Sequence, residues 1–466
     1  MRRGNARDHR PTVIVAALGS AFGVVLLLVT QSLGVALAND EFVRDSGSGA
    51  LLLSIVALVF LVIAVYVGAV VTTNTVATVI AGRTRTIALV RLIGSSAKAE
   101  RRLVAAEGLR SGLIGSVIGV IAGVAIAAGA MRVAVVTGLV PELDYPLLDP
   151  VIGLPFAMVV LTTWVASWVG TRRVLDVTPL QAVSAAEESR REHAVRRTGR
   201  TAWAVVLFTI GTLLLALGMI VGLFNPLGVL IGVVGGMLSF TGVVLGAELV
   251  MPPALRLVGR MLGRGPTARL AAANAVRYPE RSTRTTVGLV IAVTLVTMFA
   301  VTMESFRALA LAAAAESPGS FAGMDEALSV AVGVFSTLIG FSAVVAATGM
   351  INNLSLSVLQ RQRELGLLRA LGFTSSQVRG MIVAEAAQLS VTAVVVGLAL
   401  GIGYGWAGAQ SLLGSFSGEP AIIAPTVPWA LVAVLAGVAA LLTLVASIAP
   451  SHRATRVTPV AALAAN

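Results

Sequence analysis

The sequence contains no cysteine, a single lysine and only three histidines among its 466 residues. Without cysteine there is no disulfide framework, no cysteine-based zinc site and no thiol nucleophile. The histidines (His9, His193 and His452) lie far apart in polar segments, which argues against a histidine-based metal or catalytic site. The lysine, Lys98, is flanked by alanines, whereas a phosphate-binding loop requires Gly-Lys-Ser/Thr. We therefore expect no catalytic residue, no metal site and no bound cofactor on this chain.

Charge is scarce as well. Charged residues make up 12% of the chain, hydrophobic residues 57%, and the mean hydropathy is +0.92. A typical soluble domain has about 25% charged residues. Apolar runs long enough to cross a bilayer recur along the whole chain, and only helices satisfy their backbone groups in such runs. The sequence therefore predicts an all-α polytopic membrane protein.

Ten membrane spans account for the apolar runs, and the distribution of basic residues supports that number. With a cytoplasmic N-terminus, 31 of the 34 basic residues fall on the cytoplasmic side, and only Arg44, Arg132 and Arg307 fall outside. Such a bias is expected from the positive-inside rule, and it also places the C-terminus in the cytoplasm. The predicted spans are 12–37, 50–80, 103–130, 151–170, 203–224, 228–251, 284–304, 326–357, 381–408 and 428–449.

The first span has a second interpretation as a signal peptide. Ala36-Leu37-Ala38 resembles a small-residue cleavage site after a basic start. The apolar run is longer than a typical signal-peptide core, and the internal repeat described next requires this span. We therefore favour a retained membrane span.

The segment from Asn352 to Glu385 joins two long apolar runs and carries arginines between leucines at helical spacing. Such an amphipathic insert usually lies on a membrane surface or binds a partner protein. The same segment recurs earlier in the chain at one constant offset. The shift that pairs Asn352 with Asn74 also pairs Arg361 with Arg83, Arg363 with Arg85, Arg369 with Arg91, Gly372 with Gly94 and Glu385 with Glu107.

A second match, at an offset only two positions larger, pairs Pro179 with Pro459 at the end of each unit. The chain is therefore predicted to hold two four-span units in the same orientation, related by an axis along the membrane normal. The predicted domains are residues 1–185 for the first unit, 186–265 for a connector with spans five and six, and 266–466 for the second unit.

Local chemistry suggests how each unit is built. Gly372 is suited to end a helix, and Thr374-Ser375-Ser376 offers an N-cap for the next one. For Glu107 and Glu385, near the cytoplasmic end of a span, we favour a structural role over proton or substrate transfer. The glycines of 115/119/123 and 401/403/405 predict close helix packing. Glu304 and Arg307, three residues apart on one helix, are expected to pair with each other.

The motif R-x-R-E-L-G-L-L-R-A-L-G-F-T-x-x-Q-V at residues 361–378 resembles the cytoplasmic signature of FtsX/MacB-type ABC transporter permeases. Residues 270–286 resemble the amphipathic lead-in of that family, and the segments ending at Pro179 and Pro459 resemble its C-terminal tail. Two units with ten spans are similar to the Bce-type permeases. This chain departs from them because its predicted outside loops are too short for a large extracellular domain.

The resemblance implies that the two signature segments couple the permease to a homodimeric or heterodimeric ABC ATPase, which binds the ATP. One permease chain would suffice for such a complex. The first signature is degenerate, with Thr86 in place of Glu364 and Ala88 in place of Gly366. The implied coupling residues are Arg361, Arg363, Glu364, Gly366, Arg369 and Gly372, with Arg83, Arg85, Arg91 and Gly94. Asn74, Glu107, Asn352, Glu385, Pro179 and Pro459 are expected to be structural.

The implied function is ATP-driven export or extraction of a lipophilic or amphipathic substrate, such as an antimicrobial peptide, a drug or an envelope lipid, across a bacterial plasma membrane. Membrane lipids are expected partners and nucleic acid is not. Two alternatives stay open. An ion-coupled secondary transporter would need ionisable residues near mid-span, and the predicted spans contain almost none. A membrane scaffold or mechanotransmitter without transport is the other.

Overall fold

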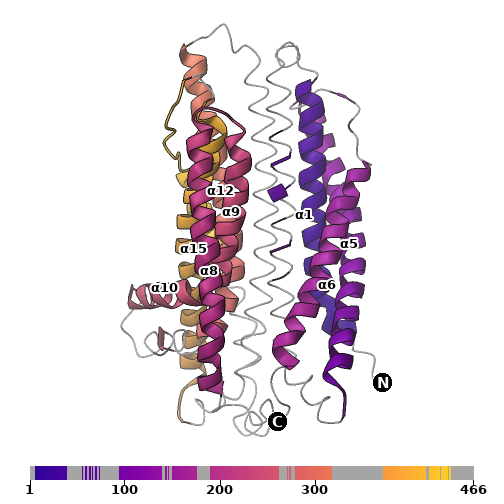
Figure 1. Ribbon diagram of the computed structural model, residues 1–466, viewed down its shortest axis with the longest axis vertical. Coiled ribbons are helices and arrows are strands. Elements are labelled where there is room, and N and C mark those ends of the chain that lie inside the picture. The colour runs from indigo at the N-terminus through magenta and orange to yellow at the C-terminus, as the bar shows by residue number, and fades with distance from the viewer. Residues whose placement is uncertain are drawn as a thin grey trace.

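The computed structural model describes residues 6–38, 94–138, 149–175, 189–261, 279–316, 371–415 and 419–441 (without 431 and 439), plus isolated positions within 55–73, 142–145 and 270–273. Every regular element in these ranges is a helix, and most run along the long axis of the molecule (Figure 1). The main helices are α1 (Ala6–Ala38), α5 (Ala97–Val136), α6 (Gly153–Leu175), α8 (Ser189–Gly222), α9 (Gly228–Leu245), α10 (Ala247–Met261), α12 (Pro279–Glu316) and α15 (Ser375–Leu413).

Within the described residues, seven helices are long and apolar enough to cross a membrane. They correspond to predicted spans one, three, four, five, six, seven and nine, which confirms a multi-pass all-α membrane protein. The other three predicted spans, 50–80, 326–357 and 428–449, lie wholly or partly outside the described residues, so the total of ten stays a prediction. The apolar windows are Thr12–Val29, Lys98–Val136, Pro150–Val169, Gly199–Gly222, Gly228–Leu245, Thr286–Ala312 and Ser375–Leu413.

Helices α1 and α5 of the first unit pack along a row of glycines. A methyl group on Gly115 would lie 2.6 Å from the Cβ of Ala16, and one on Gly123 would lie 2.9 Å from the carbonyl oxygen of Ala21. The contact positions rise together along both helices, so α1 and α5 run in the same direction. Two parallel helices are expected for the first and third spans of a chain that crosses the membrane back and forth.

Helices α12 and α15 form the matching pair in the second unit. A methyl group on Gly401 would lie 2.5 Å from the Cβ of Thr297, and one on Gly405 would lie 2.7 Å from the carbonyl oxygen of Met298. Gly403 meets no atom within 4 Å, because it points away from α12. The prediction of close packing is therefore confirmed for Gly401 and Gly405 and wrong for Gly403.

The repeat extends from the sequence to the helix contacts. Gly119 lies against the carbonyl oxygen of Ala17, and its counterpart in the repeat, Gly397, lies against that of Val290. The starts of α5 and α15 are also separated by the offset that pairs Asn74 with Asn352. The two units therefore share one packing arrangement of parallel helices in contact along glycines.

The connector forms a tight antiparallel hairpin of α8 and α9 that packs on the second unit. A methyl group on Gly218 would lie 2.5 Å from the backbone nitrogen of Gly232. Gly222 approaches the backbone of Ser411 in α15, with a corresponding distance of 2.5 Å to its carbonyl oxygen. Side chains at these positions would force the backbones apart, so glycine sets the spacing between connector and second unit.

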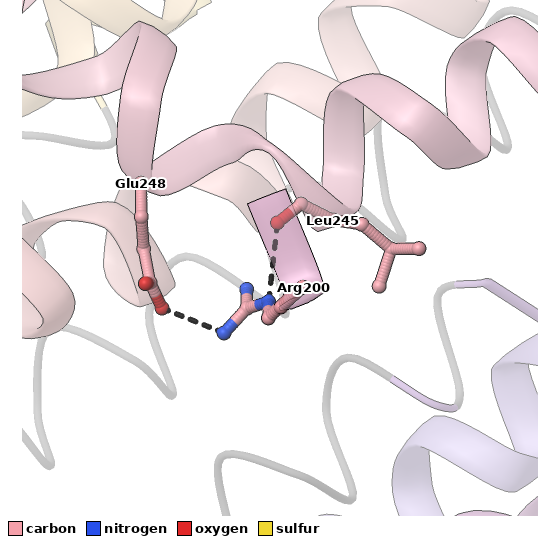
Figure 2. A network of polar contacts seen from close by, with 3 residues as sticks. All are labelled: Arg200, Leu245 and Glu248. Carbon is pink, nitrogen blue, oxygen red and sulfur yellow. Dashed lines mark hydrogen bonds and ion pairs between the residues drawn. The ribbon is translucent and has the colours of Figure 1, made fainter. Parts of the chain in front are cut away.

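The sixth span is shorter than predicted, because the chain turns at Gly246. Helix α9 ends at Leu245, and residues 247–261 form a separate helix, α10, that lies crosswise to the others (Figure 1). Arg200 of α8 fixes this corner (Figure 2). Its Nε donates to the Leu245 carbonyl at 3.2 Å, and its Nη1 donates to the Glu248 carboxylate at 2.8 Å. The arginine thus satisfies a carbonyl that has no partner within the helix at the end of α9.

Among the other predictions, the pairing of Glu304 with Arg307 is confirmed, with 3.9 Å between their charged atoms. Both side chains are substantially exposed, at 35% and 54%. An exposed pair of this kind contributes little to stability, roughly 0.2–1 kcal/mol. It gives no indication of a buried charged site within α12.

Candidate functional site

Most of the predicted coupling residues lie outside the described part of the chain, and their role stays a prediction. The described coupling residues are Gly94 and Gly372, just before the starts of α5 and α15, and the described structural ones are Glu107 and Glu385, within these helices. The residues outside it are Asn74, Arg83, Arg85, Arg91, Pro179, Asn352, Arg361, Arg363, Glu364, Gly366, Arg369 and Pro459. We call the turn with the first helical turns that follow it an elbow: residues 94–100 in the first unit and 371–378 in the second.

The second elbow is a glycine turn followed by a fully capped helix. Gly372 has a φ of +97°, a conformation that strains any residue with a Cβ. Thr374 Oγ1 accepts from the Gln377 backbone nitrogen at 3.2 Å, and Gln377 Oε1 accepts from the Thr374 nitrogen at 2.9 Å. This reciprocal pair is a capping box, and it confirms the predicted N-cap. The glycine turn and the capping box therefore define where α15 begins.

The first elbow also has a glycine turn followed by an N-capped helix, but its cap has fewer hydrogen bonds. Gly94 has a φ of +111°, and Ser96 caps α5 by accepting from the Ala99 nitrogen at 3.2 Å. Ala99 occupies the place of Gln377, so the reciprocal bond of the capping box cannot form. Ser95 instead donates to the Glu100 carboxylate at 2.6 Å. The asymmetry that the sequence shows between the two signatures thus continues into the caps.

The second elbow has one apolar side chain turned inward and one turned outward. Phe373 packs against a buried cluster of Val378, Met381 and Ile382 at the start of α15. Leu371, two residues earlier, is 71% exposed. A single exposed leucine is common on protein surfaces and does not by itself mark a binding site.

The glutamates Glu107 and Glu385 occupy equal positions, each the eleventh residue of its helix. Both are half-buried, and both interact with other groups of the protein. Three residues after Glu385, the buried Gln388 donates to the carbonyl oxygen of Leu255 in α10 at 2.8 Å. Gln388 thus ties α15 to the connector, and the structural role of Glu385 stays a prediction.

A group of contacts that the sequence did not predict joins the two units through α9. Three consecutive residues of α9 contact different helices. The Ser239 hydroxyl lies 2.9 Å from the hydroxyl of Tyr404 in α15, and the Thr241 hydroxyl lies 2.8 Å from that of Tyr66 in the first unit. The Phe240 ring packs edge-on between both tyrosines, with centroid distances of 5.9 Å to Tyr404 and 6.4 Å to Tyr66.

We call these five residues the inter-unit joint. The Tyr66 hydroxyl also donates to the carbonyl oxygen of Met237 at 2.9 Å, so it is anchored to the backbone of α9 as well as to a side chain. The chain has only four tyrosines, and two of them meet here. A rare amphipathic residue within an apolar span is the one sequence signal that could have pointed to this site. The partners it bonds depend on tertiary packing.

The chain is similar in sequence to a known protein family. The profile of the family "FtsX-like permease C-terminal" matches residues 58–179 and 336–459. The starts of the two ranges are separated by the offset that pairs Asn74 with Asn352, and their ends are the paired prolines Pro179 and Pro459. Both copies contain an elbow, and together they cover more than half of the chain.

Curated relatives agree with the profile. The chain is 28% identical over 142 residues to an uncharacterized ABC transporter permease, YknZ, of Bacillus subtilis, covering 30% of this chain and 34% of that one. It is 31% identical over 99 residues to MJ1507 of Methanocaldococcus jannaschii, also an uncharacterized ABC transporter permease, covering 21% and 23%. It is 25% identical over 138 residues to the lipoprotein-releasing system transmembrane protein LolC of Haemophilus influenzae, covering 30% and 35%. The similarity thus spans about a third or less of each relative.

Proposed function

Because this chain belongs to the FtsX-like permease family, we propose that it is the membrane subunit of an ABC transporter in which a separate ATPase drives export or extraction of a lipophilic or amphipathic substrate. The observation that carries the proposal is the pair of elbows. Each is a positive-φ glycine followed by a capped helix, and both lie at the same end of the molecule as the N-terminus (Figure 1).

Two elbows suit a partner with two equivalent grooves, such as a dimer of ATPase subunits. Closure of the dimer would push on both elbows together. A rigid cap and a fixed turn would transmit that push into α5 and α15, whereas a frayed helix end would absorb it. The glycine rows would then pass the movement to α1 and α12, because close backbone contact leaves little room for one helix to move without the other. The inter-unit joint would keep the two units in register.

The substrate class is inferred from the exposed surface and from a relative. Much of the described surface within the spans is apolar, as at Ile121 and Leu213, which are 66% and 65% exposed and would face lipid. LolC is named as the transmembrane protein of a lipoprotein-releasing system, and a lipoprotein is amphipathic. A substrate of that kind could enter sideways from the membrane. We place the complex in the bacterial plasma membrane, with both chain termini in the cytoplasm because the basic residues favour that orientation.

The first test is recovery of the partner. The chain, tagged and solubilised in mild detergent, should retain an ABC ATPase encoded in the neighbouring reading frame, and the complex should hydrolyse ATP. Recovery of the intact chain without any ATPase, from cells that express both, would refute the proposal.

The second test concerns the two signatures. Arg363→Ala with Glu364→Ala should lower permease-stimulated ATP hydrolysis more than Arg83→Ala with Arg85→Ala, because the second unit has the full signature and the complete capping box. Arg132→Ala, at the opposite end of α5, is the matched control and should leave hydrolysis unchanged. Equal losses from both pairs would disprove the asymmetry and leave the ATPase partnership intact.

A further inference from the structure

Helix α10 differs from the other described helices in both direction and surface. It lies crosswise to the bundle near the end where the elbows lie (Figure 1). One side is buried against α12 and α15, with Met251, Leu255 and Val258 at 1%, 0% and 6% exposure. Other large apolar side chains are left outside, with Leu257 at 62% and Met261 at 80%. Large exposed apolar side chains on a crosswise helix indicate that this surface contacts a membrane or another molecule.

The exposed side of α10 divides into two stripes. Val250, Leu257 and Met261 recur at spacings of seven and four residues, so they share one stripe. Arg256 and Arg260, four residues apart, lie on the neighbouring stripe and are exposed as well. The helix thus presents an apolar stripe and a basic stripe side by side, next to the face that packs on the protein. An apolar stripe beside a basic one is typical of helices that lie in a membrane surface.

The corner at Arg200 fixes the depth of α10. Arg200 is the second residue of the apolar window of α8, which begins at Gly199, and Leu245 is the last residue of the window of α9. Arg200 binds both the Leu245 carbonyl and Glu248, in the first turn of α10 (Figure 2). Helix α10 therefore starts at the level where the membrane-crossing part of its two neighbours ends.

We propose that α10 is a lipid-binding helix: it inserts Val250, Leu257 and Met261 into the boundary between headgroups and acyl chains, and it binds anionic phospholipid through Arg256 and Arg260. The placement in the cytoplasmic leaflet follows from the charge distribution of the chain. The helix is held to α15 by the Gln388 bond to Leu255, so lipid bound to α10 lies on the same rigid element as the second elbow. The proposal does not depend on the ATPase partner.

Because the chain has no cysteine, depth can be measured with single-cysteine variants. Leu257→Cys and Met261→Cys, each carrying a fluorescent label, are reconstituted as the full chain in phosphatidylcholine/phosphatidylglycerol vesicles. We expect a lipid nitroxide near the headgroup to quench both labels more strongly than one deep in the acyl chain. Ile121→Cys, on the apolar surface of α5, should show the reverse order. Lys98→Cys, at an exposed position in the first turn of α5, should be quenched by iodide dissolved in the water. Iodide quenching of both α10 labels at the level of Lys98→Cys would overturn the proposal.

The charge requirement is tested by the lipid that copurifies. Arg256→Gln with Arg260→Gln should reduce retained phosphatidylglycerol strongly, because each basic residue at an anionic surface contributes roughly a fivefold gain in binding. Arg132→Gln removes one exposed arginine at the other end of a span and is the matched control. Equal lipid retention in the double variant and the control would refute headgroup binding.

A protein could cover α10 instead, and the same labels separate that case. Adding the ATPase subunit to the vesicles should leave the lipid quenching at Leu257→Cys and Met261→Cys unchanged. If the subunit abolishes that quenching, α10 is a protein-docking surface and the lipid proposal is wrong.

Discussion

The glycine row between α12 and α15 provides a prediction with its own control. A methyl group on Gly401 would lie 2.5 Å from the Cβ of Thr297 and 2.7 Å from the carbonyl oxygen of Thr294, where ordinary contact needs 3.4–4 Å. Neither atom can turn away by a simple rotation, since one is backbone and the other is fixed to it. Gly403, two residues along the same helix, meets nothing within 4 Å. Gly401→Ala should therefore force the two helices apart, and Gly403→Ala should not.

The magnitude follows from two terms. Replacing glycine by alanine in a helix favours the helix by about 1 kcal/mol, and this gain applies at both positions. Overpacking a tight contact costs about 1–3 kcal/mol, and it applies only at Gly401. The helix term cancels in the comparison, so Gly401→Ala should be less stable than Gly403→Ala by about 1–3 kcal/mol. Gly403→Ala should be at least as stable as the parent chain.

Equilibrium unfolding in mixed detergent micelles, followed by tryptophan fluorescence, measures this difference. The pair in the first unit repeats the test: a methyl group on Gly119 would lie 2.3 Å from the Ala17 carbonyl oxygen, whereas Gly129 meets nothing within 4 Å. Gly119→Ala should be destabilised relative to Gly129→Ala by a similar amount. Equal stability within each pair would refute the packing argument for both units.

Three further predictions concern individual polar side chains. Thr374→Ala removes the N-cap of α15 and should lower the stability of the protein by about 1 kcal/mol. Amide hydrogens in the first turn of α15 should then exchange faster. Exchange as slow as in Thr374→Ser would contradict the capping role. Tyr404→Phe loses one hydroxyl contact and should lower stability by roughly 0.6–1 kcal/mol. Tyr66→Phe loses two and should lower it by roughly 1–2 kcal/mol. Unfolding midpoints equal to the parent would show that the joint contributes no stability. Arg200→Met leaves the partly buried carboxylate of Glu248 unpaired and should lower stability by about 1–3 kcal/mol. Adding Glu248→Met to the same chain should restore part of that stability. No recovery in the double variant would rule out the ion pair as the cause.

The inter-unit joint bears on how two similar units act as one machine. Each unit has its own parallel helix pair, and a single tripeptide of α9 bonds to both. A helix that presents successive residues in directions about 100° apart can contact different neighbours with adjacent side chains. Simultaneous loss of Tyr66 and Tyr404 hydroxyls would show, by a double-mutant cycle, whether the two contacts are coupled through Phe240.

Composition and periodicity alone determined the membrane class, most of the spans and the two-unit plan. These properties depend on the local sequence or on residue counts. An apolar run must be helical in lipid whatever it packs against, and a repeat can be recognised by comparing the sequence with itself. Seven predicted spans and both offsets of the repeat are confirmed. The cap at Thr374 was also predictable, because a threonine side chain bonds to the backbone three residues away. The coupling role of the arginines and of Glu364 stays a prediction.

Only the tertiary structure decided which glycines pack, where the sixth span ends and how the units are joined. The sequence does not distinguish Gly401 from Gly403, and the side of α15 on which α12 packs decides which of them is in contact. The turn at Gly246 lies within a run that is apolar enough to continue, and Arg200, 45 residues before Leu245, fixes it there. The bonds of Tyr66 and Tyr404 to α9 join residues 165 to 175 positions apart. Contacts at such distances depend on how helices are arranged in space, and no periodicity along the chain records that arrangement.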